Sequence, residues 1–188
     1  HVFKGMGRKV GMTSTDGVVI DERLVIRSDA SGPKSARMVL QNPRVDVAVF
    51  EVARGGILRE GLGYQRNDVA VVLNVQPDHL GMRGIDTVEQ LADVKAVVVE
   101  AVPRDGHAVL NADDPLVRAM RAVSRARPWF YSPDADNPYL DDALVIVGVA
   151  SWLKVRKDPE GYLFGVLEAA PGKLATFRQR RDVKIGRA

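Results

Sequence analysis

Short, mainly apolar runs recur along the first 132 residues, and between them lie longer segments whose apolar positions follow a helical period. The runs predict buried strands, which span residues 45–50, 69–75, 108–110 and 128–131. The intervening segments predict helices over residues 31–40, 54–61, 87–102 and 116–123. Because strands and helices alternate, we expect an α/β fold with a mainly parallel sheet and helices on both faces.

The beginning of the chain has a different pattern, with three short apolar segments separated by turns. Residues 10–15, 18–20 and 24–26 are predicted strands, and the Asp16-Gly17 pair predicts the first turn. Residues 1–6 resemble the last turn of a helix that ends at a glycine cap. Ser31 is a candidate N-cap for the next helix, because a proline follows it within the first helical turn.

After Ser132 the helix–strand alternation stops, and this change divides the chain. Residues 133–138 are polar and predict a linker, whereas residues 143–149, 152–155 and 162–167 are short apolar segments. We therefore predict an α/β domain over residues 1–132 and a small β-rich appendage, or part of a following domain, over residues 133–188.

The composition indicates the class of protein and its cellular environment but not its function. The 188 residues are 46% hydrophobic, include no cysteine, and contain no unbroken apolar run of membrane-spanning length. We expect a soluble, cytoplasmic protein that binds no membrane. The net charge is +3, and much of the excess lies in residues 173–187, where few aromatics interleave. This pattern favours a solvated basic tail over a nucleic-acid interface.

Acidic and imidazole side chains follow three predicted strands. Glu51 follows the predicted strand 45–50, and Asp78 and His79 follow the predicted strand 69–75. Asp113 and Asp114 follow the short predicted strand 108–110. Parallel strands end at one edge of a sheet, so these residues are expected to converge there. Carboxylates and imidazole suit Mg²⁺ or Mn²⁺.

Each of these residues also has a simpler interpretation. Glu51 could be an ion-paired loop residue, and His79 could cap or pack against a helix. Asp113 and Asp114 could cap the helix that follows them. The case for a metal site therefore rests on their joint placement.

A phosphate-binding loop would be expected beside such ligands, but the 188 residues contain none. The glycines of residues 5–11 have the wrong spacing for a dinucleotide-binding fingerprint. The Pro-Gly-Lys-Leu of residues 171–174 lacks the hydroxyl residue that follows the P-loop lysine, and Leu167 replaces the leading glycine.

Five stretches together resemble the Mur-ligase-like half of the cyanophycin synthetases. The Ala-Arg-Gly-Gly-Ile-Leu-Arg run within residues 51–62 is specific to that family, whereas the Asp-His and Asn-x-Asp-Asp elements are shared by Mur ligases in general. The resemblance follows the order of the family over roughly residues 1–120. Its stretches are residues 13–17, 32–40, 51–62, 74–95 and 109–115.

The resemblance implies an incomplete, P-loop NTPase-like Mur ligase central domain and an ATP-dependent amide ligase. Such a ligase phosphorylates a carboxylate to an acyl phosphate, which an amine then attacks. In this family the expected reaction joins the α-amino group of arginine to an aspartate side chain of the growing polymer. The implied cofactors are ATP and Mg²⁺, and the implied partner is a polymer or peptide of aspartate and arginine. A homo-oligomer remains an open alternative.

The resemblance also implies roles for individual residues. Glu51 and His79 match Mg²⁺ ligands, and Lys95 matches a lysine that Mur enzymes carbamylate; His79 and Lys95 are thus the candidate catalytic residues. An unmodified Lys95 would be only a surface charge. Asn111 and Asp114 match the residues that hold adenine and ribose. Thr13, Thr15 and Arg54 match the residues that contact the acceptor carboxylates.

One element of the family is absent from these residues, namely a Gly-Lys-Thr P-loop expected just before residue 1. We expect truncation to explain this better than divergence, and we expect this chain alone to show no ligase turnover, because phosphoryl transfer depends on positioning. Two alternatives stay open: a degenerate, non-catalytic domain that binds nucleotide or acidic peptide, and a Mur ligase of the cell-wall or folate branch.

Overall fold

A computed structural model describes residues 2–78, 80–81, 83–134 and 137–140. The helices of this part are α1 (Val2–Gly5), α2 (Pro33–Leu40), α3 (Arg54–Glu60), α4 (Val88–Glu100) and α5 (Pro115–Ala119), with 3₁₀ turns η1 (Met120–Ala122) and η2 (Pro138–Leu140). The strands are β1 (Val10–Ser14), β2 (Gly17–Ile20), β3 (Arg23–Ile26), β4 (Val47–Phe50), β5 (Val69–Val72), β6 (His107–Asn111) and β7 (Pro128–Tyr131).

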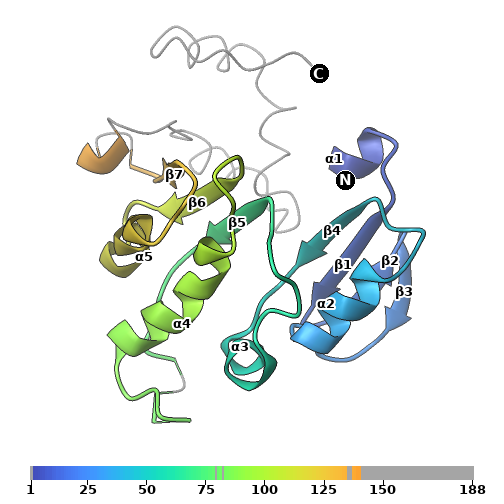
Figure 1. Ribbon diagram of the computed structural model, residues 1–188, viewed down its shortest axis with the longest axis horizontal. Helices are drawn as coiled ribbons and strands as arrows, with labels where there is room; N and C mark the ends of the chain where they lie inside the picture. Colours follow the sequence, from blue (N-terminus) through green and yellow to red (C-terminus); the bar gives the residue numbers. More distant parts are fainter. Residues whose placement is uncertain (1, 79, 82, 135–136, 141–188) are drawn as a thin grey trace, which may run out of the picture.

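The strands form two sheets (Figure 1). Sheet A has the order β3-β2-β1-β4, in which β1 and β4 are parallel and the other two pairs are antiparallel. Sheet B has the order β5-β6-β7, and both of its pairs are parallel. The α/β class and the parallel pairing of the buried strands are thus confirmed, and the strands divide between two sheets rather than forming one.

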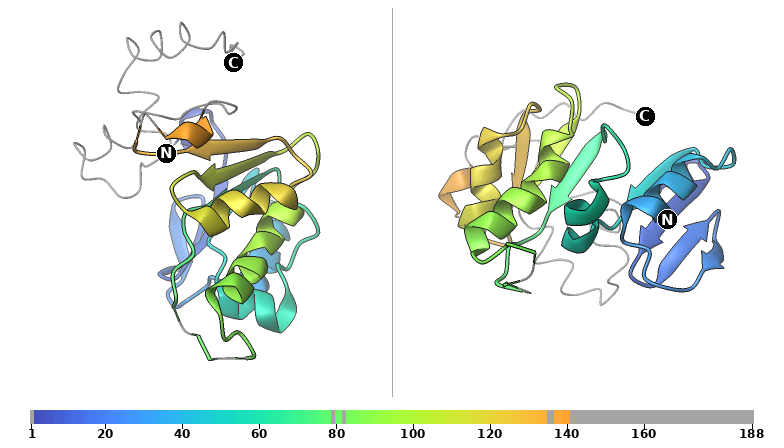
Figure 2. Two further views of the ribbon diagram at one scale, coloured as in Figure 1. Left: turned by 90° about the vertical axis from the view of Figure 1, so that its left-hand side faces the viewer. Right: turned by 60° about the horizontal axis from the view of Figure 1, so that its bottom comes forward.

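The helices α2 to α5 form a continuous layer, since each contacts the next along the chain. α2 packs on sheet A, whereas α4 and α5 pack side by side on sheet B (Figures 1 and 2). The close approach of α2 to β1 depends on Gly11, where an added Cβ would lie 2.4 Å from a methyl group of Val39. Within the described residues these packed helices lie on one face of the sheets.

The larger hydrophobic core lies between sheet B and helices α4 and α5. Alternate residues of the three strands point into it, and α4 contributes Leu91 and Val99. Burying a side chain of this size stabilises the fold by roughly 1.5–3 kcal/mol. The inward-facing strand residues are Ala70, Val72, Ala108, Leu110 and Phe130.

The opposite side of β5 is open within the described residues. Val69, Val71 and Leu73 are 52%, 43% and 61% exposed, because their side chains point away from α4. β5 is an edge strand of sheet B, as β4 is of sheet A. Helix α3 therefore connects two edge strands that do not pair with each other.

Local chemistry determines where the helices begin. α4 begins at a capping box, in which the Thr87 side chain accepts from the Gln90 backbone N–H while the Gln90 side chain accepts from the Thr87 N–H. The first turn of α2 is approached closely by Gly63, whose φ of +82° and tight contact with Pro33 exclude a side chain. This contact fixes the loop after α3 against the beginning of α2.

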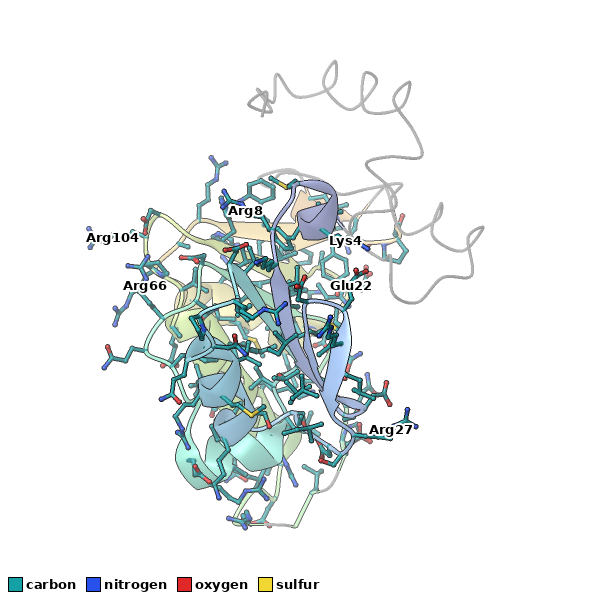
Figure 3. The ribbon with its side chains drawn as sticks, turned by 90° about the vertical axis from the view of Figure 1, so that its right-hand side faces the viewer. Lys4, Arg8, Glu22, Arg27, Arg66 and Arg104 are labelled. Carbon is teal, nitrogen blue, oxygen red and sulfur yellow. The ribbon has the colours of Figure 1, made fainter. Side chains whose placement is uncertain are left out.

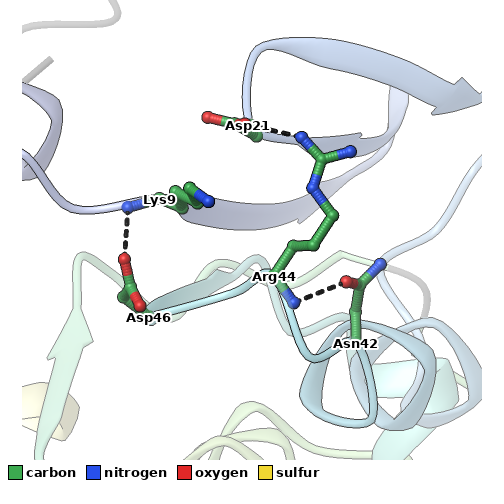
Figure 4. Close-up of polar contacts among 5 residues, drawn as sticks. All are labelled: Lys9, Asp21, Asn42, Arg44 and Asp46. Carbon is green, nitrogen blue, oxygen red and sulfur yellow. Dashed lines mark hydrogen bonds and ion pairs between the residues drawn. The ribbon is translucent and has the colours of Figure 1, made fainter.

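Polar contacts connect the segment before β4 to sheet A (Figure 4). The Lys9 backbone N–H donates to the Asp46 carboxylate at 2.8 Å, and the Arg44 guanidinium donates to Asp21 at 3.0 Å. The Asn42 side chain accepts from the Arg44 backbone N–H, so it closes the turn that ends α2. These bonds attach the connection between α2 and β4 to the residues that precede β1 and follow β2.

Basic side chains are distributed over the surface of the described part. In Figure 3, Arg27 lies far from Arg66 and Arg104, and Lys4 pairs with Glu22. No helix among the described residues is long and apolar enough to cross a membrane.

Two local predictions are wrong. The first hairpin turns at Thr15 and Asp16, and Gly17 already begins β2. The N-cap of α2 is Gly32 and not Ser31, and no side chain caps this helix; the Ser31 hydroxyl donates to Asp29 at 2.6 Å. Most of the predicted appendage lies outside the described residues, so the boundary at residue 132 stays a prediction.

Candidate functional site

The strands of sheet B end together, and their last residues carry polar side chains. In the parallel register Asn111 of β6 is the partner of Tyr131 of β7, and Val72 of β5 is the partner of Leu110. Leu73, Asn111 and Tyr131 therefore lie in one row at the carboxyl edge of the sheet. Open α/β sheets place their ligand sites at this edge.

Four side chains converge on the three residues that follow β5. The Asn111 amide donates to the Leu73 carbonyl at 2.8 Å, and the Tyr131 hydroxyl approaches the same oxygen at 3.4 Å. The Lys95 ammonium donates to the Asn74 carbonyl at 2.9 Å. The Val75 backbone N–H donates to the Asp114 carboxylate at 2.7 Å. Three residues singled out in the sequence thus hold one segment of backbone, Leu73–Val75.

Asp114 makes two kinds of contact at once. Its Oδ1 accepts the N–H groups of Leu116 and Val117 at 2.9 and 3.2 Å, so it is the N-cap of α5. Its Oδ2 accepts the Val75 N–H. The simpler interpretation of Asp114 as a helix cap is therefore correct, and the carboxylate also crosslinks two strand ends.

Asp113 faces the other side of the same turn. Its Oδ1 accepts from the Ser132 hydroxyl at 2.7 Å and from the Asn137 amide at 2.8 Å. Ser132 is completely buried. Asp113 therefore anchors the chain after β7 and is not a helix cap.

Tyr131 has a strongly perturbed phenol. Burial raises the pKa of Tyr131, and the negative charges of Asp113 and Asp114 raise it further, to about 12. The phenol therefore stays protonated at neutral pH and can donate a hydrogen bond. Sequence reasoning missed this residue, although its position at the end of β7 matches that of Asn111 at the end of β6.

The remaining candidates lie at the carboxyl ends of β1 and β4 in sheet A. The exposed Glu51 follows β4, and its Oε2 accepts the Thr15 backbone N–H at 3.0 Å. Thr15 is exposed, and the partly buried Arg54 begins α3. Thr13 is only 1% exposed, and its hydroxyl has no hydrogen-bond partner among the described residues.

A small cavity lies beside Glu51, between α2 and α3. It has a volume of about 10 Å³, which is room for about one water molecule. Its walls include Ser31, Gly32, Phe50 and Tyr64, and the last two stack with ring centroids 5.7 Å apart. Burial raises the pKa of Tyr64.

The proposed metal ligands are only partly described. His79 lies outside the described residues, but residues around it are fixed, because Val75 and Ile85 are buried in the core and the Gly81 N–H donates to the Ile85 carbonyl. No group of three His, Cys, Asp or Glu side chains in the described ranges could hold a metal ion. The Mg²⁺ assignment of Glu51 and His79 therefore stays a prediction.

Comparison with known proteins gives a consistent result. The family model of the Mur ligase middle domain matches residues 1–169. Cyanophycin synthetase from Synechocystis sp. is 49% identical over 151 residues, which are 80% of this chain and 17% of that protein. The enzyme of the same name from Crocosphaera subtropica is 54% identical over 137 residues, covering 73% of this chain and 16% of that protein.

A more distant relative and two solved structures extend the comparison. UDP-N-acetylmuramoyl-tripeptide–D-alanyl-D-alanine ligase from Mycobacterium bovis is 49% identical over 59 residues, 31% of this chain and 11% of that protein. The structure of UDP-N-acetylmuramoyl-L-alanyl-D-glutamate–2,6-diaminopimelate ligase has a TM-score of 0.55 at 19% identity, covering 72% of this chain and 28% of its own. E. coli FolC, in complex with DHPP and ADP, has a TM-score of 0.50 at 17% identity, covering 70% and 37%.

These structures show the fold alone, whereas the family model and the curated relatives show the family. The chain spans about 17% of the length of the cyanophycin synthetases that it matches. It belongs to the Mur ligase middle-domain family and resembles the part of the cyanophycin synthetases that contains this domain.

Proposed function

We propose that this chain is part of an ATP-dependent amide ligase that adds arginine to the aspartate side chains of cyanophycin through an acyl phosphate. The observation that carries the proposal is the convergence of Lys95, Asn111 and Asp114 on Leu73–Val75, at the edge of sheet B. The identity of 49–54% with cyanophycin synthetases supports the choice of this ligase over the cell-wall and folate branches.

Glu51 suits a Mg²⁺ ion that ATP brings with it. Mg²⁺ in such sites keeps several waters and takes one or two carboxylates besides the phosphates, so a single exposed carboxylate is sufficient. Glu51 Oε2 accepts the Thr15 N–H, and the Glu51 side chain is exposed. When bound, the ion would neutralise phosphate charge, and we propose Glu51 and His79 as its protein ligands.

Lys95 is proposed as a catalytic residue together with His79. Its ammonium group donates to the Asn74 carbonyl, so the side chain of α4 already reaches the segment that leads to His79. Carbamylation would leave one N–H on that nitrogen for the same bond and would add a carboxylate beyond it. Arg54 and Thr15 are proposed to attract the acceptor carboxylates, because a cation lowers the repulsion between two anionic substrates.

Thr13 is the least accessible of the proposed acceptor contacts. Its buried hydroxyl lies on the face of β1 that packs on α2, as Gly11 does. A direct contact to the polymer would require the residues that cover Thr13 to move.

We expect the 188-residue chain by itself to show no ligase turnover, because it contains no P-loop to position the γ-phosphate. The test is therefore a chimera, in which the matching part of this chain replaces the corresponding 151-residue stretch of the Synechocystis enzyme. Its ADP release is measured with ATP, Mg²⁺ and an aspartate polymer, with and without arginine. The proposal predicts arginine-dependent release.

Two variants of the chimera make the test specific. Glu51→Gln removes the charge that binds the metal, and we expect a loss of about a hundred-fold or more. Glu100→Gln makes the same change at an exposed position at the end of α4 and should leave the rate unchanged. A chimera that binds Mg-ATP without arginine-dependent release would favour the second candidate function, a non-catalytic nucleotide-binding domain.

A further inference from the structure

We propose that Asp114 is a positioning residue, which fixes the exit of β5 through the Val75 N–H, and that it does not contact the ribose of ATP. The inference rests on the proposed function where it concerns ATP. The crosslink itself concerns only residues of this chain and can be tested without nucleotide.

The hydrogen bonds of Asp114 leave little of its carboxylate for a ligand. An ionised carboxylate offers about four acceptor positions. Three are used, by the N–H groups of Leu116, Val117 and Val75 at 2.9, 3.2 and 2.7 Å. The bond to Val75 is the shortest of the three, and a bond with a charged acceptor is about twice as strong as a neutral one.

Among the residues that the structure describes, no strand pairs with the segment that receives this bond. β5 is the edge strand of sheet B and ends at Val72, so the following residues have left the sheet ladder. Side chains supply the missing partners, since Asn111 and Lys95 bind the Leu73 and Asn74 carbonyls and Asp114 binds the Val75 N–H. Among these contacts Asp114 provides the acceptor.

The position of Val75 matters because the loop to Asp78 and His79 begins directly after it. The Val75 side chain is 6% exposed and belongs to the core of sheet B. Loss of the Asp114 bond would leave the Val75 N–H without its acceptor near the core. The loop that carries the proposed metal ligand would then lose its anchor at the end of β5.

A serine at position 114 separates the two contacts of the aspartate. Serine is as good an N-cap as aspartate, so Asp114→Ser keeps the cap of α5. Its single hydroxyl cannot accept at the same time from the Val75 N–H on the other side. Asp105→Ser is the matched control, because it removes a carboxylate from an exposed turn between α4 and β6.

The first measurement is amide hydrogen exchange of the whole 188-residue chain without nucleotide. In Asp114→Ser we expect the Val75 amide to exchange about ten- to a hundred-fold faster, while Leu116 and Val117 stay as in the wild type. In Asp105→Ser all three amides should be unchanged. An unchanged Val75 amide in Asp114→Ser would overturn the crosslink.

The second measurement separates positioning from direct contact, using the chimera with ATP and with 2′- and 3′-deoxy-ATP. If Asp114 positions the loop, Asp114→Ser raises KM for all three nucleotides by the same factor. If Asp114 binds a ribose hydroxyl, the preference of the wild type for ATP over one deoxy nucleotide disappears in the variant, which overturns the proposal. A chimera without turnover would refute the proposed function, and the exchange of Val75 would still decide the crosslink.

Discussion

The pKa of Tyr131 leads to a specific prediction about stability at alkaline pH. The phenol lies half-buried beside Asp113 and Asp114, and its pKa is raised from the ordinary 10.0 to about 12. Between these two pH values the unfolded chain has lost a proton that the folded chain keeps. The free energy of unfolding therefore falls as the pH rises from 10 to 12, whereas below pH 10 the contribution of Tyr131 is complete.

The size of the effect follows from the same two values. Each factor of ten in proton affinity corresponds to about 1.4 kcal/mol, so the upper limit is about 2.7 kcal/mol. Solvent reaches part of the ring and screens the two carboxylates, which lowers the expected loss to about 1–2 kcal/mol. The shift is caused first by burial and only second by the two charges.

The assay is urea unfolding of the wild type and of Tyr131→Phe at several pH values up to 12. At neutral pH the variant should lose little, because the hydrogen bond to the Leu73 carbonyl is long, at 3.4 Å. Above pH 10 the wild type should lose about 1–2 kcal/mol more than the variant. Parallel curves for the two proteins would refute the reasoning.

Two further predictions concern the elements that hold the site in place. Gly63→Ala places a Cβ 2.6 Å from the Pro33 carbonyl oxygen, whereas the Cβ of Gly84→Ala, at a similar positive φ, meets nothing within 4 Å. Urea unfolding should therefore show that Gly63→Ala costs at least about 2 kcal/mol more stability than Gly84→Ala. Equal losses would show that the loop after α3 relaxes freely. Thr87→Ala removes the capping box of α4 and should lower the free energy of unfolding by about 1–2 kcal/mol in the same assay. Thr87→Ser keeps a capping hydroxyl and should lower it by only about 0.2–0.4 kcal/mol. A serine variant as unstable as the alanine variant would count against the cap.

The sequence predicts much of this arrangement because strand ends have a simple geometry. Asn111 and Asp114 follow an apolar run, and the parallel pairing of such runs brings their ends to one edge. The use of these side chains could not be predicted, because Asp114 binds a backbone N–H that is 39 residues away. Tyr131 was missed since its environment depends on the same long-range register.

The N-cap of α2 and the division of the strands into two sheets could not be predicted from the sequence, for other physical reasons. Ser31 has the residue type expected of an N-cap, but it lies one residue before the cap position, and its N–H and hydroxyl both donate to Asp29 in a local turn. The sequence around α3 predicts a strand–helix–strand unit and does not say whether its two strands are neighbours. In the structure, β4 and β5 belong to different sheets.

We propose that ATP binds at the carboxyl edge of sheet B, and the most direct test is amide hydrogen exchange of the chimera with and without Mg-ATP. We predict that Mg-ATP slows exchange in residues 73–75 and 111–114 and leaves β3, on the far side of sheet A, unchanged. Slower exchange confined to other segments, or none at saturating Mg-ATP, would contradict it.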